Sequence, residues 1–155
     1  MIENLELRMY GLVNYQLSGI QQGIQYCHGV TEYSLLYEGF YKQWARYHKT
    51  SIILNGGTTN DNPLCLGTLN RYAELLTANG VMNATFREPD LGNQLTSVVF
   101  IVDERVFKKN IYPDYIGEKY NSEYNHWLES IGGPVNEFLR NFLSQGNNSK
   151  PFNLA

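Results

Sequence analysis

The stretch Phe86-Arg-Glu-Pro-Asp-Leu-Gly-Asn-Gln-Leu-Thr96 decides the fold, because it joins two apolar runs through a short polar turn. The residues before it, Val81 to Phe86, predict a short strand. The residues after it, Ser97-Val-Val-Phe-Ile-Val102, form a continuous β-branched and aromatic run, which is typical of a strand covered on both faces. The sequence therefore predicts a hairpin within a sheet that has helices on both sides.

The turn of this hairpin concentrates polar side chains. Pro89 restrains its own φ and disfavours helical geometry at Glu88, while Gly92 and Asn93 tolerate positive φ, so a tight loop is expected. In one interpretation Asp90 caps its own backbone within the hairpin. In the other, the two carboxylates and the neighbouring amides form part of a functional site.

Length and composition favour one domain. With 155 residues, 43% of them hydrophobic, the chain is long enough for one core and short for two. We expect a single domain over residues 1–145, with a C-terminal helical addition from about residue 103 and a flexible tail over 146–155.

Other features of the sequence bear on location and chemistry. The chain has no apolar run of membrane-spanning length, and its start, with Glu3 and Glu6, is unlike a signal peptide, so a cytoplasmic protein is expected. Cys27 and Cys65 lack metal-ligand spacing and are predicted to be buried free thiols. The three histidines are scattered, so we predict no metal site, and no cofactor motif is found.

The predicted elements alternate between strands and helices. They are a strand at Leu7 to Val13, a helix capped by Ser18 that continues to Trp44 with a break at Gly39, a strand at Ser51 to Leu54, a helix at Thr68 to Ala78, the hairpin, and C-terminal helices near 103–109, 123–129 and from Pro134. Helical crossovers make the first strands parallel. The predicted fold is thus a three-layer α/β/α sandwich with a small mixed four-stranded sheet plus C-terminal helices.

Two faces stand out on the first helix. The residues Ile20, Ile24, Cys27 and Thr31 follow helical spacing and are predicted to face the core. A polar row, Gln21, Gln25 and His28, lies on an adjoining face. Gly23 and Gly29 weaken a helix, so each predicts close approach by a ligand or another backbone, or close packing on the sheet.

The final helix is the most clearly amphipathic one. Its apolar residues recur at i, i+3, i+4, i+7 and i+8: Val135, Phe138, Leu139, Phe142 and Leu143. This face should pack either on the domain or on a second copy of the chain. A homodimer through this helix is one expectation, and intramolecular packing is the simpler one.

Two motifs carry a family resemblance. Leu12-Val13 followed by Ser18-Gly-Ile-Gln-Gln-Gly-Ile-Gln-Tyr-Cys-His-Gly29 is similar to a strand and helix carrying Gly-Lys-x-x-Ala-Gln-x-x-His-Ala, with Gln25 and His28 at matching spacing. Asp90-Leu-Gly-Asn-Gln-Leu-Thr96 is similar to an Asp-Ala-Gly-x-Thr segment with two extra residues. Both segments belong to type 2 peptidyl-tRNA hydrolases, and the combination most resembles their small phage-encoded branch, which shows Glu-Pro-Asp-Leu-Gly-Asn before its last strand. The resemblance covers Leu7 to Val102.

The resemblance implies an α/β sandwich and cleavage of the ester between tRNA and an amino acid or peptide. One departure affects the second expectation: Gln21 stands where the family has its functional lysine, and a neutral amide cannot supply that point charge. Gly29 also replaces the family's alanine. The fold expectation is unaffected, whereas tRNA hydrolysis is less well supported.

The first functional hypothesis is a hydrolase acting on an ester or phosphodiester of a small nucleotide. A histidine ordinarily changes charge near neutral pH, so His28 could act as acid or base while Asp90 orients it or a water molecule. Thr96 and Gln25 could donate hydrogen bonds. The expected catalytic residues are therefore His28, Asp90 and Thr96, and the expected ligand-binding residues are Gln21, Gln25, Glu88, Asn93 and Tyr15.

Two further hypotheses stay open. A pocket lined by amides and some of the twelve tyrosines would suit a protein that sequesters a nucleotide without cleaving it. Alternatively, the partner is the acceptor end of tRNA, although a net charge of −3 is unfavourable for holding many phosphates. Because phages make small proteins that cut or sequester nucleotide immune signals of their hosts, a phage-type counter-defence protein in the host cytoplasm is the preferred reading.

Overall fold

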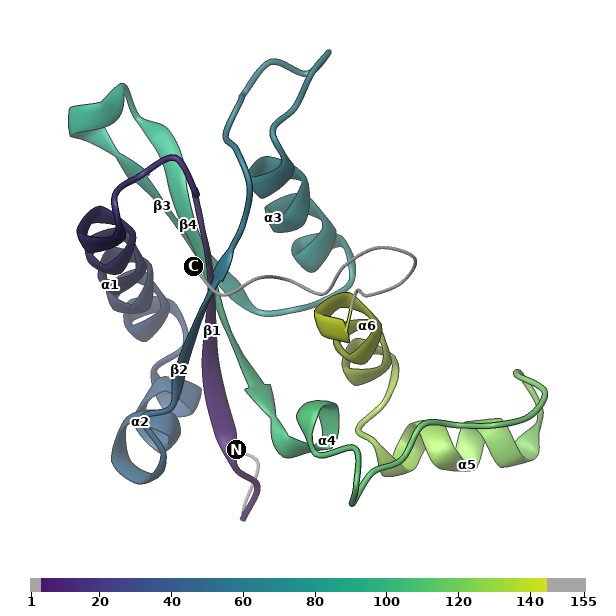
Figure 1. Ribbon diagram of the computed structural model, residues 1–155. Helices are drawn as coiled ribbons and strands as arrows, with labels where there is room; N and C mark the ends of the chain where they lie inside the picture. The colour runs from purple at the N-terminus through teal and green to yellow at the C-terminus, as the bar shows by residue number, and fades with distance from the viewer. Residues whose placement is uncertain (1–3, 145–155) are drawn as a thin grey trace.

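Four strands form one mixed sheet in the computed structural model, which describes residues 4–144 (Figure 1). They are β1 (Leu7–Val13), β2 (Ser51–Asn55), β3 (Asn83–Glu88) and β4 (Gln94–Asp103), in the order β2-β1-β4-β3. β1 and β2 are parallel, whereas β4 is antiparallel to both β1 and β3. The mixed four-stranded sheet is confirmed, and the apolar run Ser97 to Val102 lies inside it.

Helices cover both faces of this sheet, as predicted (Figure 1). On one face, α1 (Gly19–Leu36) and α2 (Glu38–Tyr47) enclose a core that includes Met9, Tyr33 and Val99. On the other face, α3 (Thr68–Ala78) and α6 (Pro134–Ser144) enclose a second core around Phe100. The short α4 (Glu104–Phe107) and α5 (Ser122–Ser130) follow β4. The three-layer α/β/α architecture is therefore present.

Two predicted boundaries are wrong for local reasons. The first helix ends at Leu36 instead of Gly39, because Tyr37 leaves helical geometry at φ −131° and ψ 59°. β3 begins at Asn83, two residues later than predicted, because Val81 N donates to Leu76 O and so closes the end of α3 (3.0 Å). Gly80, with φ 79°, provides the left-handed turn of that cap.

The predicted core face of α1 is also wrong. Ile20 is 79% exposed and Ile24 is 39% exposed, and Cys27 and Thr31 are exposed as well. The opposite face is buried instead, through Gln25, Tyr26, Gly29 and Tyr33. A side chain at Gly29 would collide with Val99 and Ser97 of β4, whereas one at Gly23 would meet nothing within 4 Å. Close packing on the sheet therefore explains Gly29 and leaves Gly23 unexplained.

The cysteine prediction is half wrong. Cys27 and Cys65 are free thiols as expected, but both are exposed rather than buried. Cys27 lies on the solvent side of α1 for the same reason as Ile20 and Ile24, and Cys65 lies in the loop before α3.

The apolar face of α6 packs within the chain. Leu139 and Phe142 are buried in the core around Phe100. Phe138 and Leu143 are partly buried and pack against this core, and Val135 remains 36% exposed. The feature that suggested a dimer through this helix is thus accounted for by intramolecular packing.

Buried charged groups tie the C-terminal addition to the sheet. Asp103, at the end of β4, accepts two bonds from the Arg105 guanidinium (3.0 and 3.1 Å) and one from Asn136 of α6 (3.2 Å). Arg140, 3% exposed, donates to Arg105 O and to Asp114 Oδ1 (both 2.7 Å). These bonds satisfy charges that would be costly to bury alone.

Within residues 4–144, no helix is long and apolar enough to cross a bilayer. The tail predicted over 146–155 lies outside the described residues.

Candidate functional site

A β-bulge brings Thr96 to the first helix. Phe86 pairs with Ser97 and Arg87 pairs with Leu95, so Thr96 is an extra residue in β4. Its Oγ1 donates to Gln25 Oε1 of α1 (2.7 Å), and the neighbouring Ser97 Oγ donates to Gln25 O (2.8 Å). The bulge thus lets two consecutive hydroxyl groups reach one residue of α1.

Gln25 and Thr96, which were predicted to belong to the same site, therefore lie in contact. Both side chains, however, are almost completely buried. Gln25 is 1% exposed and Thr96 is 0% exposed. Their mutual bond fastens α1 to β4. In this arrangement both residues act as positioning groups, and neither presents a free surface to a ligand.

His28 occupies a different environment, on the flank of α1 that faces β3. Its half-buried ring packs against Phe86, with 4.6 Å between ring centroids and planes tilted by 52°. The buried Nδ1 has no hydrogen-bond partner within residues 4–144. Gln21 lies two helical turns earlier on the same flank and is exposed. His28 and Gln21 are therefore the members of the predicted polar row that lie nearer solvent.

The hairpin turn holds the remaining predicted acidic and amide groups. Asp90 is exposed in the 3₁₀ turn η1 (Pro89–Leu91), and Glu88 is half-buried at the end of β3. Gly92 and Asn93 have φ values of 67° and 60°, and Asn93 N donates to Glu88 O (3.0 Å). The tight positive-φ turn is thus confirmed.

Asp90 is not joined to His28. Among the described residues, no hydrogen bond or ion pair involves the Asp90 carboxylate, either with His28 or with its own backbone. A histidine acting as general base is normally oriented by a second group. The structure brings Gln25 and Thr96 together and leaves the predicted acid–base pair unassembled.

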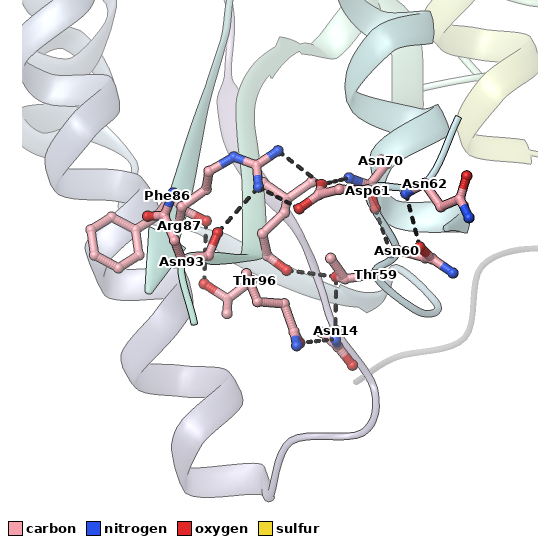
Figure 2. Close-up of polar contacts among 12 residues, drawn as sticks. Asn14, Thr59, Asn60, Asp61, Asn62, Asn70, Phe86, Arg87, Asn93 and Thr96 are labelled. Carbon is pink, nitrogen blue, oxygen red and sulfur yellow. Dashed lines mark hydrogen bonds and ion pairs between the residues drawn. The ribbon is translucent and has the colours of Figure 1, made fainter. Parts of the chain in front are cut away.

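Asn14 organises the end of the sheet, and sequence reasoning missed its role. It follows β1 and is 1% exposed. Its Oδ1 accepts from Gln16 N (2.8 Å), and its Nδ2 donates to Thr59 Oγ1 (3.2 Å) and to Gln94 Oε1 (3.1 Å). Thr59 Oγ1 in turn donates to Leu95 O (2.6 Å), as Figure 2 shows. One amide therefore joins β1, the loop after β2 and the start of β4.

An ion pair extends this network toward α3 (Figure 2). Arg87 of β3 donates to both carboxylate oxygens of Asp61 (3.0 and 3.1 Å) and to Asn93 O (3.1 Å), and Asn70 Nδ2 donates to Asp61 Oδ1 (2.8 Å). The bonds from Arg87 lower the pKa of Asp61. We call Asn14, Thr59, Asp61, Asn70, Arg87 and Gln94 the sheet-end network. Its one cation is already paired.

In the sequence, the feature that could have predicted this network is the position of its polar residues directly after strands. Asn14 directly follows β1, and the loop with Thr59 and Asp61 follows the parallel β2, so both leave the sheet at the same edge. The ion-pair partner of Asp61 could not be predicted from the sequence, because Arg87 lies 26 residues away.

Tyr15 is the exposed aromatic residue beside the sheet-end network. Its side chain is 50% exposed, while its N–H donates to Gly57 O (3.1 Å). Gln22 Nε2 also donates to Tyr15 O (3.4 Å) and Leu17 O (2.8 Å), which holds the loop between β1 and α1. A fixed backbone with an exposed ring suits stacking of a planar ligand.

Two hollows in the described part of the chain are lined by residues other than the predicted site residues. An open groove of about 540 Å³ runs along β3 and is lined by Leu36, Ala73, Glu74, Thr77, Ala78, Asn83, Ala84 and Thr85. A smaller cavity of about 120 Å³ lies between α5 and α6, around Trp127 and Arg140. Among residues 4–144, no group of three or more His, Cys, Asp or Glu side chains is placed to hold a metal ion.

Comparison with models of known protein families found no match to this chain, and comparison with curated proteins found none either.

Proposed function

We propose that this chain binds a small nucleotide-containing ligand, such as a cyclic nucleotide immune signal, at the α1 flank that carries Gln21 and His28. Binding without cleavage is the preferred form of the proposal. In a phage, such a protein would act as a counter-defence factor by removing the signal from solution.

The observation that carries the proposal is the state of His28. Its ring is half-buried against Phe86, yet Nδ1 has no partner among the described residues. Buried polar groups are usually hydrogen-bonded, so an unpartnered one is a reason to look for a ligand or a water molecule. Because no carboxylate within residues 4–144 bonds to the ring, the arrangement favours a binding role over general-base catalysis.

The nucleotide class is supported by neighbouring groups and by the family resemblance. Gln21 and Asn93 are exposed amides, which can pair with the edge of a base, and Tyr15 is an exposed ring on which a base can stack. The motifs around Gln25, His28 and Asp90 resemble those of a family that acts on the nucleotide end of tRNA.

A tRNA ligand is less well supported. The chain has a net charge of −3, and Arg87, the cation of the sheet-end network, is engaged by Asp61. Gln21 is neutral where the resembling family carries lysine. Holding a polyanion depends on several free cationic contacts.

Hydrolysis of the small nucleotide is the second candidate. The ionisable side chain on the α1 flank favours it, because histidine can both accept and donate a proton near neutral pH. The reaction would require Asp90 or another group to approach His28 when the ligand binds. Gln25 and Thr96 would hold α1 in place instead of contacting the substrate.

The test uses purified protein with cyclic dinucleotides, ADP-ribose-type signals and charged tRNA as separate probes. Binding is followed by calorimetry and product formation by chromatography. The proposal expects one small nucleotide to bind and to be recovered intact, and charged tRNA to remain uncleaved. Absence of binding to every small nucleotide, together with hydrolysis of charged tRNA, would replace it with the tRNA reading.

Two substitutions refine this test. His28→Ala should weaken ligand binding about tenfold, the loss corresponding to one hydrogen bond. His126→Ala, an exposed histidine on α5, is the matched control and should bind like the wild type. If the wild type instead cleaves the nucleotide, and His28→Ala abolishes turnover while binding persists, the hydrolase candidate is correct.

A further inference from the structure

The cavity between α5 and α6 has an aromatic wall. Its volume is about 120 Å³, and the rings of Tyr115, Tyr124 and Trp127 line it. Their centroids lie 5.4 to 5.8 Å apart, so the three rings form one packed group. Tyr124 is buried, whereas Tyr115 and Trp127 are half-buried and keep part of their surface free. Such ring faces can stack on a planar ligand. We call this hollow the α5–α6 cavity.

A carboxylate without a cationic partner also lines the α5–α6 cavity. Glu137 is half-buried, and its Oε2 accepts a hydrogen bond from the Tyr124 hydroxyl. No Lys, Arg or His within residues 4–144 forms an ion pair with it. Asp114, the other acid in the wall, differs because Arg140 (2.7 Å) and Lys109 (2.9 Å) both bond to its Oδ1. A carboxylate can only accept hydrogen bonds, so Glu137 has room for an N–H donor from a ligand.

Positive charge lies beside this carboxylate. Lys119 lines the α5–α6 cavity, is exposed, and has no ion-pair partner in the described part of the chain. Around the cavity, the three cations Lys109, Lys119 and Arg140 thus face only two carboxylates, although the whole chain has a net charge of −3. A local excess of positive charge favours an anionic group next to the aromatic wall.

Tyr120, beside the cavity, has a strained backbone. Its φ is 65°, its side chain is 85% exposed, and its ring meets that of Tyr124 at 5.4 Å. A bulky residue rarely adopts positive φ, and holding it there costs free energy. Because so exposed a ring gains little from burial, packing within the chain does not account for this strain. A contact between the Tyr120 ring and a ligand in the neighbouring cavity accounts for it.

We propose that the α5–α6 cavity binds a pyrimidine nucleotide. The base stacks on the aromatic wall, an N–H group on its edge donates to Glu137, and the phosphate lies near Lys119. The exposed ring of Tyr120 covers the bound nucleotide from the solvent side.

The size and polarity of the cavity select this class of ligand. An apolar cavity of about 150 Å³ holds one benzene molecule. A volume of about 120 Å³ therefore suits the single ring of a pyrimidine better than the two fused rings of a purine. Cytosine presents an amino group and uracil a ring N–H, and either can donate to Glu137. A plain benzene ring has no such donor and would leave the half-buried carboxylate unpaired.

This site is separate from the α1 flank. The cavity lies between α5 and α6, and α6 covers the face of the sheet opposite to α1. The inference therefore does not rest on the function proposed above, and either can fail without the other.

Calorimetry on the purified chain tests the ligand class, with CMP, UMP, AMP and phenyl phosphate as probes. CMP or UMP should bind at least about tenfold more tightly than AMP, which has two fused rings, and than phenyl phosphate, which has one ring and a phosphate but no N–H donor. If neither pyrimidine nucleotide binds, the inference is wrong. Equal binding of AMP or of phenyl phosphate would also contradict it, because neither ring size nor the N–H edge would then be recognised.

Substitutions test the location of the site. Glu137→Gln should weaken binding of the preferred pyrimidine nucleotide about tenfold. Tyr120→Asn should also weaken it about tenfold through lost stacking, yet raise the thermal midpoint, because Asn tolerates positive φ. Tyr47→Ala, at a 73% exposed tyrosine of α2, is the matched control and should bind like the wild type. Wild-type affinity in Glu137→Gln or in Tyr120→Asn would contradict the proposed site, and loss of binding in His28→Ala would move the nucleotide to the α1 flank.

Discussion

Thr96 and Gln25 show how two side chains can hold a helix on a sheet. The hydroxyl and the amide are 71 residues apart in sequence, fully buried, and joined by a 2.7 Å hydrogen bond. Both were predicted to belong to a functional site, and in the structure both are buried and hold α1 on β4. His28, three residues after Gln25 on α1, is only half-buried, and its buried Nδ1 has no hydrogen-bond partner among residues 4–144.

At the residue scale we predict that Thr96→Val destabilises the protein. Valine keeps the shape and removes the donor, so the buried Gln25 Oε1 loses its partner, at a cost of about 1–3 kcal/mol in the free energy of unfolding. Thr85→Val is the matched control, because Thr85 is exposed on β3 and should change stability by less than ~0.5 kcal/mol. Urea denaturation measures both. Equal stability of Thr96→Val and wild type would mean that the bond contributes nothing.

At the scale of elements, the main feature of α1 is the choice of the face that packs on the sheet: the face with Tyr26 and Gly29 is buried, and the face with Ile20 and Ile24 is exposed. Tyr26 fits over Gly11 of β1, where any side chain would collide with the ring, and Gly29 allows β4 to approach. The two glycines in the middle of α1 therefore have different roles: Gly29 permits packing, whereas Gly23 faces open space.

The two glycines give opposite predictions when each is replaced by alanine. Gly29→Ala should lower the free energy of unfolding by about 1–3 kcal/mol, because the new Cβ must displace Val99 or Ser97. Gly23→Ala should raise it by up to about 1 kcal/mol, because alanine is the better helix former and nothing obstructs it. Thermal denaturation at low protein concentration measures both signs. Similar shifts in the two variants would show that α1 packs on the sheet with a different face.

At the scale of the whole molecule, the C-terminal addition completes one of the two cores. Leu139 is 3% exposed and shares a cluster with Leu69, Leu76 and Phe100, and α6 is further held by Arg140 and Asn136. The segment after residue 103 is therefore an integral part of the packed structure on that face of the sheet.

We predict that Leu139→Ala lowers the free energy of unfolding by about 2–5 kcal/mol, through lost burial and the cavity left behind. Val135→Ala, on the same helix but 36% exposed, should cost clearly less. Circular dichroism and fluorescence should report the same transition midpoint in each variant, because one cooperative unit is disrupted. A separate early transition confined to the C-terminal helices would instead show that they unfold independently.

The sequence by itself determined the elements and the class of fold. The strand Leu7–Val13, the helix Thr68–Ala78 and the start of α6 at Pro134 have the predicted bounds, because hydrophobic period, glycine caps and proline act locally along the chain. The tight turn at Gly92 and Asn93 was readable for the same reason. The expectation that the first helix and the hairpin turn meet at one edge of the sheet came from the family resemblance, not from local signals.

Only the tertiary structure decided which residues of α1 face inward and how the end of the sheet is connected. Helical period offered Ile20 and Ile24 as a core face, yet the buried face is the one whose polar Gln25 meets two hydroxyls at a bulge in β4. The sheet-end network likewise depends on partners such as Asn14 and Gln94, which lie 80 residues apart. Two faces of one helix can show the same hydrophobic period, and hydrogen bonds and steric fit to distant segments decide which of them is buried. The sequence pattern of a single segment carries no information about those distant partners.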